Sequence, residues 1–410
     1  MYNRDIRILF VTLHCPFGAS YGAKVRVLNI GRLLNRIGKV SLVIVRPFPV
    51  DEESLNRTRQ EFDLKRIVYL NPNSLRNPVD RIRHRIRHEL DPSYLKTEGI
   101  EACESDREAM LRMIDEYDVI WVHTLRVANA LQIFRWPHTV IDIDDIRSRF
   151  YASVAKSEAA IFKRVLSYRR SFLWRRRERL LKKRFSLISV CSENDRQYLG
   201  GGHRIHVIPN GFTLPVKVLD HAPSLPARLG FIGSFLWMPN RVGVEWFIRD
   251  VWPLIKRDAP DIKLRLIGKG SNENYPSMGP DIDGLGYVED PTEEVATWSA
   301  MIVPVTVGGG TRVKIAEAFS RKCPIVSTTL GAFGYQVING EDLLLADSPQ
   351  DFASACVLLV NNRELGSKIS GNAWKKFLKN WTWDSIGTSV SMAVRECLNR
   401  NNYEQHFSIS

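Results

Sequence analysis

The sequence lacks the features that define several large classes of protein. It has no long, uniformly apolar run, so it contains no predicted transmembrane helix. Its six cysteines lie far apart and form no C-x-x-C pair, which excludes a disulfide framework or a zinc site as the organising feature and favours the cytoplasm. No G-x-G-x-x-G or P-loop pattern is present, so the usual fingerprints for nicotinamide and ATP binding are missing.

Charge is present in ordinary amounts but is unevenly placed. The 410 residues are 44% apolar and 25% charged, which is typical of a globular protein with two domains. Residues 1–200 hold 37 Lys and Arg against 24 Asp and Glu, whereas the remainder holds 21 of each, so the first half carries the whole net charge of +13. This asymmetry indicates either a polyanionic partner for one domain, such as nucleic acid, an anionic membrane or a phosphorylated acceptor, or a solvated basic face.

Short β-branched runs alternate with longer amphipathic stretches, beginning with a predicted strand at Ile6–Leu13. Strands separated by helices predict parallel sheets covered on both faces. The pattern breaks near Pro209-Asn210-Gly211 and starts again at Leu229–Gly233. We therefore expect an α/β fold with two Rossmann-like, doubly wound domains that face each other across a cleft, over residues 1–205 and 206–384. A last helix over about 385–400 has the length to pack back on the first domain.

The most informative segment is a predicted strand that leads into three glycines, Gly308–Gly310, and a helix predicted to start near Thr311. Glycines let the backbone approach a ligand, and the amides at a helix start bind anions. Arg312 and Lys314 add positive charge where it opposes the helix dipole, which is unfavourable unless an anion binds there. Glu317 is placed to accept two ribose hydroxyls. The segment predicts a phosphate site; a plain glycine turn before an amphipathic helix is the alternative.

Polar residues also follow the strands predicted in the first half. The first loop places Gly22 at a sheet edge, although a plain turn explains this glycine equally well. His123 ends one predicted strand, and Asp142 and Asp145 end another, where α/β sheets present their ligands. We consider these three as catalytic candidates, with a structural role as the alternative for His123. The run from Asp142 also contains a D-x-D pattern, which holds a divalent metal in some glycosyltransferases and is common by chance.

With these motifs the chain resembles the nucleotide-sugar-dependent glycosyltransferases of GT-B architecture, specifically the retaining enzymes of family 4. The similarity runs from the N-terminal glycine turn through Pro209-Asn210-Gly211 and Phe231-Ile232-Gly233 to Gly286-Tyr287-Val288 and the glycine loop. In that family two glutamates spaced E-x7-E close on the donor. The second corresponds to Glu317 and implies ribose binding, whereas the first falls on Gly309, as in a variant with a triple-glycine loop.

Other site residues follow from the same resemblance. Backbone amides of Gly309, Gly310 and Thr311 are implied to replace the missing carboxylate at the donor sugar. The family's arginine after the strand-end glycine falls on Ser234, and its lysine falls near Asn240 or Arg241, so Arg312 and Lys314 are implied to carry the pyrophosphate charge. The segment around Val288 corresponds to the place where backbone atoms contact the base. His123 corresponds to a histidine that contacts the donor sugar.

The resemblance implies a metal-independent hexosyltransferase with a nucleotide sugar as substrate and no cofactor. UDP is slightly favoured over GDP, on family frequency alone. Retention is explained in the family by front-face attack, in which the leaving phosphate accepts the acceptor's proton. The implied acceptor is a glycan, lipid-linked, in cell-surface polysaccharide synthesis. A nucleotide-sugar 2-epimerase of GT-B shape and a polyanion-binding protein are the alternatives; a nucleic-acid partner is disfavoured because no helix-turn-helix, RRM or KH signature occurs.

The most basic segment is Lys163–Arg184, with 11 Lys or Arg and the single acid Glu178. On a helix its leucines and Trp174 form an apolar stripe, and cations fill much of the remaining surface. Either the stripe packs on its own domain and the cations are solvated, or the segment rests on an anionic membrane surface or a lipid diphosphate acceptor. The second possibility predicts a peripheral protein on the inner face of the membrane.

Overall fold

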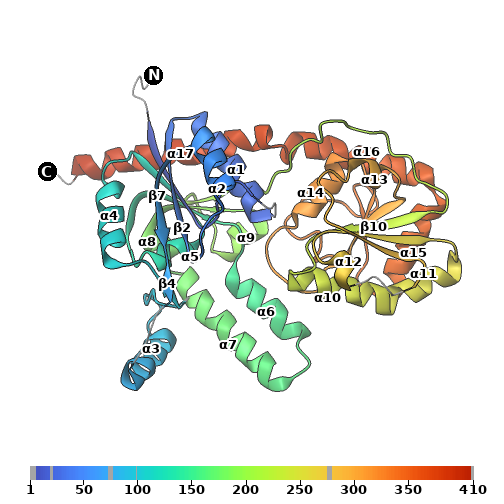
Figure 1. The fold of residues 1–410 in the computed structure, drawn as a ribbon, viewed down its shortest axis with the longest axis horizontal. Helices are drawn as coiled ribbons and strands as arrows, with labels where there is room; N and C mark the ends of the chain where they lie inside the picture. The colour runs from blue at the N-terminus through green and yellow to red at the C-terminus, as the bar shows by residue number, and fades with distance from the viewer. Residues whose placement is uncertain (1–5, 19–21, 73–76, 98, 275–278, 408–410) are drawn as a thin grey trace. The chain divides into compact units, whose positions relative to one another are not determined.

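A computed structural model describes residues 6–18, 22–72, 77–97, 99–274 and 279–407 of the chain (Figure 1). The chain divides into two compact units. Unit 1 contains Met1–Ser148, Leu166–Pro209 and Ile386–Ser410, and unit 2 contains Arg149–Val165 and Asn210–Ser385. The boundary at Pro209 lies beside the break that the sequence pattern shows.

Unit 1 is built on a seven-stranded sheet of order β3-β2-β1-β6-β7-β8-β9, in which every pair of neighbours is parallel. The central strands are buried on both faces, as parallel sheets covered by helices require. The strands are β1 Arg7–Thr12, β2 Lys39–Arg46, β3 Asp63–Tyr69, β6 Val119–His123, β7 Trp136–Ile143, β8 Phe185–Val190 and β9 Ile205–Val207, with a separate antiparallel pair, β4 Asn71–Pro72 and β5 Ile100–Glu101.

The helices of this half connect the parallel strands in chain order. They are α1 Gly22–Asn35, α2 Glu52–Glu61, α3 Pro78–Leu90, α4 Glu104–Ile114, α5 Leu125–Ala130, α6 Arg147–Ser157, α7 Ile161–Glu178, α8 Leu181–Arg184 and α9 Glu193–Tyr198. The last helix of the chain, α17 Trp383–Phe407, belongs to unit 1 from Ile386 onward. A hydrogen bond between His206 Nε2 and Glu396 Oε2 at 3.0 Å holds it beside β9.

Unit 2 repeats the same winding on a six-stranded parallel sheet of order β12-β11-β10-β13-β14-β15. In chain order this is 3-2-1-4-5-6, the Rossmann arrangement, which binds ligands outside the carboxyl ends of the strands. The strands are β10 Arg228–Ile232, β11 Lys263–Ile267, β12 Ile282–Gly286, β13 Ala300–Val303, β14 Ile325–Ser327 and β15 Leu344–Leu345.

Two apolar clusters cover the two faces of this sheet. Along β13, Ile302 belongs to one cluster, while Met301 and Val303 belong to the other, as the alternation of side chains along a strand predicts. The covering helices are α10 Met238–Trp246, which continues through a π-helical turn at Phe247–Val251 into α11 Trp252–Asp258, then α12 Ser271–Asn274, α13 Thr292–Ala296, α14 Val313–Ser320, α15 Pro349–Asn361 and α16 Arg363–Asn380.

Local sequence patterns misplaced two elements. The sequence pattern predicts the third strand of unit 2 at Gly286–Val288, but the strand ends at Gly286, because the apolar pattern of Ile282-Asp-Gly-Leu-Gly286 is interrupted by glycines. For Ala155–Arg184 the pattern predicts a helix or a bent pair, whereas the structure has three helices there, α6, α7 and α8. Residues 149–165, which include most of α6 and the start of α7, belong to unit 2. Arg149 stacks on Phe333, with 4.2 Å from its guanidinium carbon to the ring centroid. None of the helices in the described ranges is long and apolar enough to cross a bilayer.

Candidate functional site

The glycine loop lies between β13 and α14 at the carboxyl edge of the unit 2 sheet. Gly308 has φ +133°, which side chains rarely adopt, and its amide donates a hydrogen bond to Ser153 Oγ on α6 at 2.9 Å. Thr311 Oγ1 accepts a hydrogen bond from Asn210 Nδ2 at 2.8 Å, which ties the loop to the Pro209-Asn210-Gly211 motif. The loop is therefore braced on both sides, and the amide of Gly308 already has a partner within the chain.

The helix after the loop starts two residues later than the sequence predicted. Its first residue is Val313 and its N-cap is Arg312, so Arg312 precedes the first turn. The Arg312 Nη1 atom donates to the carbonyl oxygens of Gly309 and Gly310. The guanidinium therefore lies over the glycines. To bind a phosphate, it would have to give up its hydrogen bonds to these two carbonyl oxygens.

Lys314 occupies the first turn of α14 and points to the end of the neighbouring strand β10. Its Nζ donates to Asn240 Oδ1 at 2.9 Å and lies 3.7 Å from the centroid of the Phe231 ring. The side chain is buried, and its partner is a neutral amide. Burial lowers the pKa of Lys314 well below its usual value, Arg312 lowers it further, and Glu317 opposes this shift. An anion at this point would stabilise the charged amine.

Glu317 lies one turn further along the same face of α14 and is mostly buried. Its Oε1 pairs with Arg321 Nη1 at 3.2 Å. Burial raises the pKa of the Glu317 carboxyl, while Arg321 and Lys314 partly offset this effect. A carboxylate has about four lone-pair positions, so one ion pair leaves capacity for two hydroxyl groups.

The backbone packs closely around Lys314 at the carboxyl end of β10. A Cβ on Gly233 would lie 3.0 Å from Lys314 Nζ, and one on Gly268 would lie 2.1 Å from the Gly233 oxygen. The Ser234 oxygen accepts a hydrogen bond from Asn240 Nδ2 at 2.8 Å, which orients the amide so that its oxygen faces Lys314. The family resemblance placed a lysine near Asn240. In this chain the amide of Asn240 itself accepts a hydrogen bond from Lys314, a lysine of α14.

The expected base-contacting segment lies just beyond β12. Val288 follows the end of this strand, is half-buried and packs against the apolar cluster around Trp298. Its neighbour Tyr287 is exposed. The structure places Val288 and the glycine loop at the carboxyl ends of strands in one sheet, so both belong to the same edge of unit 2.

At the carboxyl edge of unit 1, Asp142 forms a buried ion pair. Arg26 Nε and Nη2 donate to its two carboxylate oxygens at 2.9 and 2.6 Å, and Ser189 Oγ donates at 2.6 Å. Arg26 also donates to the carbonyl oxygens of Ile208 and Pro209. The Arg26 guanidinium holds the pKa of Asp142 below its usual value despite burial. These contacts favour a structural role for Asp142 over the catalytic role considered from the sequence.

His123, at the end of β6, has a different environment. Both ring nitrogens are buried and have no hydrogen-bond partner among the described residues; the nearest charge is Asp144 Oδ2, 3.8 Å from Nε2. The ring packs edge-on against His14 at 5.7 Å between centroids. Burial lowers the pKa of His123, and burial together with nearby cations lowers that of His14 to about 3. Both rings are neutral near pH 7 and suit hydrogen bonding to hydroxyl groups.

The remaining candidates of unit 1 lie at the same sheet edge. Gly22 is the exposed first residue of α1, and Asp145 is half-buried just after β7. Within the described ranges no group of three or more His, Cys, Asp or Glu is arranged to hold a metal ion. The first carboxylate of the D-x-D pattern, that of Asp142, is already paired with Arg26.

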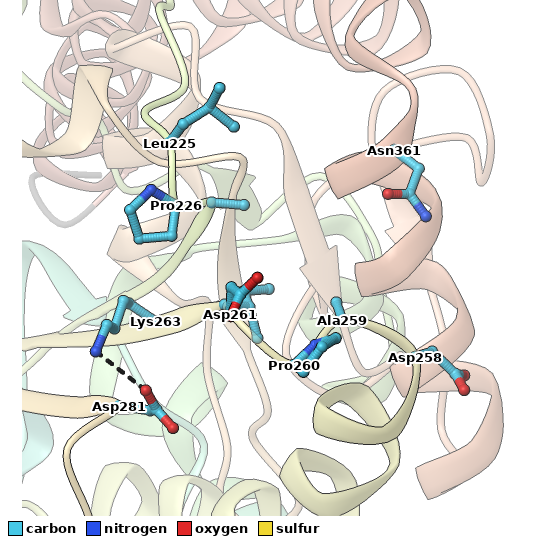
Figure 2. Close-up of a pocket in the computed structure, with 11 residues that line it drawn as sticks. Leu225, Pro226, Asp258, Ala259, Pro260, Asp261, Lys263, Asp281 and Asn361 are labelled. Atoms are coloured by element: carbon cyan, nitrogen blue, oxygen red, sulfur yellow. Dashed lines mark hydrogen bonds and ion pairs between the residues drawn. The ribbon is translucent and has the colours of Figure 1, made fainter.

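A hollow of about 660 Å³ lies at the opposite edge of the unit 2 sheet (Figure 2). Its walls come from segments that precede β10, β11 and β12, around Pro226, Pro260 and Asp281. Lys263 Nζ and Asp281 Oδ1 form an ion pair beside it at 3.0 Å. Because it opens at the amino ends of the strands, it is separate from the glycine loop and from the edge where such sheets bind nucleotides.

The chain is similar in sequence to known proteins. Residues 226–362, about a third of the chain, match the family described as "Glycosyl transferases group 1". Over 401 residues the chain is 21% identical to an "Uncharacterized 44.6 kDa protein in cps region" of Klebsiella pneumoniae, covering 94% of this chain and 98% of that protein.

Solved structures resemble both units. Anabaena HepE, in complex with UDP and glucose, matches 95% of this chain and 100% of its own, at 14% identity and a TM-score of 0.61. TarM of S. aureus, in complex with Fondaparinux, alpha-GlcNAc-glycerol and UDP, matches 94% and 99% at 11% identity and a TM-score of 0.66. The chain has the GT-B fold. Two parallel-sheet, Rossmann-like α/β domains, as the sequence predicted, are confirmed.

Sequence reasoning missed several residues of these two edges. His14 was not predicted as a site residue, although its place two residues after the end of β1 is a signal for the sheet edge. Ser153 and Arg26 had no such signal, since only the fold brings them to Gly308 and Asp142.

Proposed function

We propose that the protein is a retaining glycosyltransferase, which moves a hexosyl unit from a nucleotide-sugar donor to a glycan acceptor. The observation that carries this proposal is the buried Lys314 amine at the tip of β10, held by the neutral amide of Asn240 beside a braced glycine loop. A cation without a carboxylate partner, at the carboxyl edge of a Rossmann sheet, has the chemistry of a diphosphate site.

Each part of this edge has a distinct role in the proposal. Lys314 binds the pyrophosphate, and the amides of Gly309, Gly310 and Thr311 contact the donor sugar. Arg312 reinforces the charge once its guanidinium leaves the loop carbonyls. Glu317 accepts hydrogen bonds from the ribose hydroxyls, and the backbone near Val288 contacts the base.

The chemical step needs charge stabilisation more than a nucleophile. The bond between the anomeric carbon and the β-phosphate oxygen breaks, a bond to the acceptor oxygen forms, and the acceptor proton moves to the leaving phosphate. Charge develops on the pyrophosphate as that bond breaks, so fixed cations and amides there stabilise the transition state. We propose that they act without a bound metal and that attack occurs on the same face, with retention.

The acceptor is proposed from the comparisons. The K. pneumoniae relative is described as lying in a cps region, and TarM was solved with a glycan and UDP. Both support a glycan acceptor, lipid-linked, in cell-surface polysaccharide synthesis. HepE and TarM were each solved with UDP, which supports UDP over GDP.

A nucleotide panel tests the proposal. One nucleoside diphosphate among UDP, GDP and ADP should raise the unfolding temperature, because a ligand at 100 times its Kd stabilises by about 2.7 kcal/mol. Its nucleotide sugars should then release that diphosphate slowly, with or without EDTA. Interconversion of sugars would identify an epimerase instead. If no nucleotide stabilises the protein and no nucleotide sugar is consumed, the proposal is wrong; strict dependence on Mn²⁺ would overturn metal independence.

A further inference from the structure

The helix α3 carries an apolar stripe that nothing in the described chain covers. Val79, Ile82, Ile86 and Leu90 are three or four residues apart, so they lie along one face of the helix. Their exposed fractions run from 52% to 69%, and no residue of α3 is buried. An isolated exposed leucine needs no explanation, but four large apolar side chains in one row do.

A second exposed stripe runs along α7. Ile161, Val165, Tyr168 and Phe172 have the same spacing and are all exposed. The packing face of α7 lies on the other side, where Leu173 and Trp174 are buried, as one of the two interpretations of the basic segment expected. The helix therefore has an apolar face beyond the one that it uses for folding.

The two stripes are joined where α3 ends. Arg176 of α7 donates to the carbonyl oxygens of Glu89 and Leu90, at 2.8 Å each, and lies 5.9 Å from the centroid of the Phe172 ring. Arg169 forms an ion pair with Glu89. The carbonyls at the end of α3 are thus held by cations of α7, and the two exposed stripes adjoin at Arg176.

Arginines border both stripes. At 100° per residue, Arg83 and Arg85 lie on either side of the α3 stripe, and both are exposed. Arg175 and Arg176 border the α7 stripe in the same way. A row of apolar side chains between rows of cations is the pattern of helices that lie in the interface of an anionic bilayer.

The α3 stripe and the part of the α7 stripe formed by Tyr168 and Phe172 belong to unit 1 and are placed at one edge of its sheet. In chain order α3 comes after the carboxyl end of β3, and α7 comes after that of β7, the edge at which His123 lies. In Figure 1 both labels appear at this end of the strands.

We propose that the exposed faces of α3 and α7 dock on an anionic lipid bilayer. The apolar stripes enter the headgroup region, and the exposed arginines Arg83, Arg85 and Arg175 bind lipid phosphates, while Arg176 holds the two helices together. This inference goes beyond glycosyl transfer and does not depend on it. It also changes the expectation for Lys163–Arg184, because Arg177 and Arg184 are buried and bind carbonyls of His88, Ile133 and Phe134. The surface therefore combines α3 with the exposed face of α7 only, and the buried arginines at the end of that segment take no part in it.

Vesicle co-sedimentation with the whole protein tests the proposal. Vesicles of phosphatidylglycerol and phosphatidylcholine should bind it at low salt, vesicles of phosphatidylcholine alone should not, and added salt should weaken binding. Ile82→Asp with Ile86→Asp, and Arg83→Glu with Arg85→Glu, should each lower the bound-to-free ratio by roughly tenfold or more. All four side chains are exposed, so these variants should fold, which circular dichroism and unchanged nucleotide binding would verify.

Matched variants on unit 2 serve as controls. Leu358→Asp with Leu378→Asp changes exposed leucines, and Arg249→Glu with Arg257→Glu makes the same change in net charge as the arginine pair of α3. Both should bind anionic vesicles like the original protein. Equal binding to neutral and anionic vesicles, or undiminished binding of the α3 variants, would overturn the proposal. A dimer that the Ile82 and Ile86 changes dissociate, without vesicle binding, would assign the surface to a second copy of the chain.

Discussion

The carboxyl edges of the two sheets hold the same kinds of residue in opposite arrangements. In unit 1, Arg26 and Asp142 satisfy each other through two hydrogen bonds in a fully buried pair. In unit 2, Lys314 is buried against the neutral amide of Asn240, and Glu317 pairs with Arg321 through Oε1.

Under the proposed function, this difference separates charges that stabilise the fold from charges that bind the donor. A buried charge is costly unless it is paired. Asp142 is a full ionic partner for Arg26, whereas the described residues give Lys314 the amide of Asn240 and the ring of Phe231, both neutral, so an added anion can still improve the environment of the amine. The position at a strand end, which is all that the sequence shows, does not distinguish the two cases.

The largest effect is expected from breaking the ion pair between Arg26 and Asp142 in unit 1. Asp142→Ala leaves the Arg26 guanidinium buried without its carboxylate, and we expect the free energy of unfolding to fall by about 3–5 kcal/mol in denaturant titrations. Replacing both partners, by Arg26→Met with Asp142→Leu, should cost less because no unpaired charge remains. A stable Asp142→Ala protein without turnover would instead support the catalytic role considered from the sequence.

The second effect concerns the unit 2 carboxylate. Glu317→Ala should weaken binding of the nucleoside diphosphate by about 2–4 kcal/mol, because hydrogen bonds to a charged group contribute about 1.5–3 kcal/mol each and are not fully additive. Isothermal calorimetry measures this, with Glu317→Gln as the variant that keeps the shape and removes the charge. Undiminished affinity in both variants would contradict the assignment to ribose.

Local patterns predicted the architecture because each strand and helix repeats a short-range signal. The run of Ile8–Val11 and its parallel partners alternate with helices as doubly wound sheets do, and the strand predicted at Ile6–Leu13 matches β1 at Arg7–Thr12. The glycine loop could be located because Gly308–Gly310 change the composition abruptly.

What the sequence did not reveal depends on long-range pairing. Asp142 meets Arg26 across 116 residues, and Gly308 meets Ser153 across 155. The helix α14 begins at Val313 and not at the predicted Thr311, because Arg312 donates hydrogen bonds to the loop carbonyls and is the N-cap residue of the helix. Residue type and spacing do not determine such contacts. The sequence therefore could not distinguish the structural role of Asp142 from the binding role proposed for Lys314.

A third prediction sharpens the comparison through pH. The pKa of Lys314 is well below its usual value because the amine is buried, so it loses its proton at a lower pH than an ordinary lysine does. A bound diphosphate favours the charged amine, and its affinity should fall by up to about tenfold per pH unit above the pKa of the unliganded protein. Lys314→Arg, which stays charged, should remove this dependence. Calorimetry between about pH 7 and 10 avoids titration of the phosphate itself; parallel curves for the two proteins would contradict the role of Lys314.

The smallest expected effect concerns His123, which resembles Lys314 in lacking its full set of partners. Because both ring nitrogens are buried and unsatisfied, His123→Leu should change the free energy of unfolding by less than about 1 kcal/mol, or raise it. If the neutral ring donates to a hydroxyl of the donor sugar, the same variant should lower kcat/KM by about tenfold and leave the Kd of the free diphosphate unchanged. The lowered pKa also predicts that His123 adds no acid limb near pH 6.5 to the activity profile. A loss of several kcal/mol of stability would show that His123 is needed for packing, and full turnover in His123→Leu would remove it from the site.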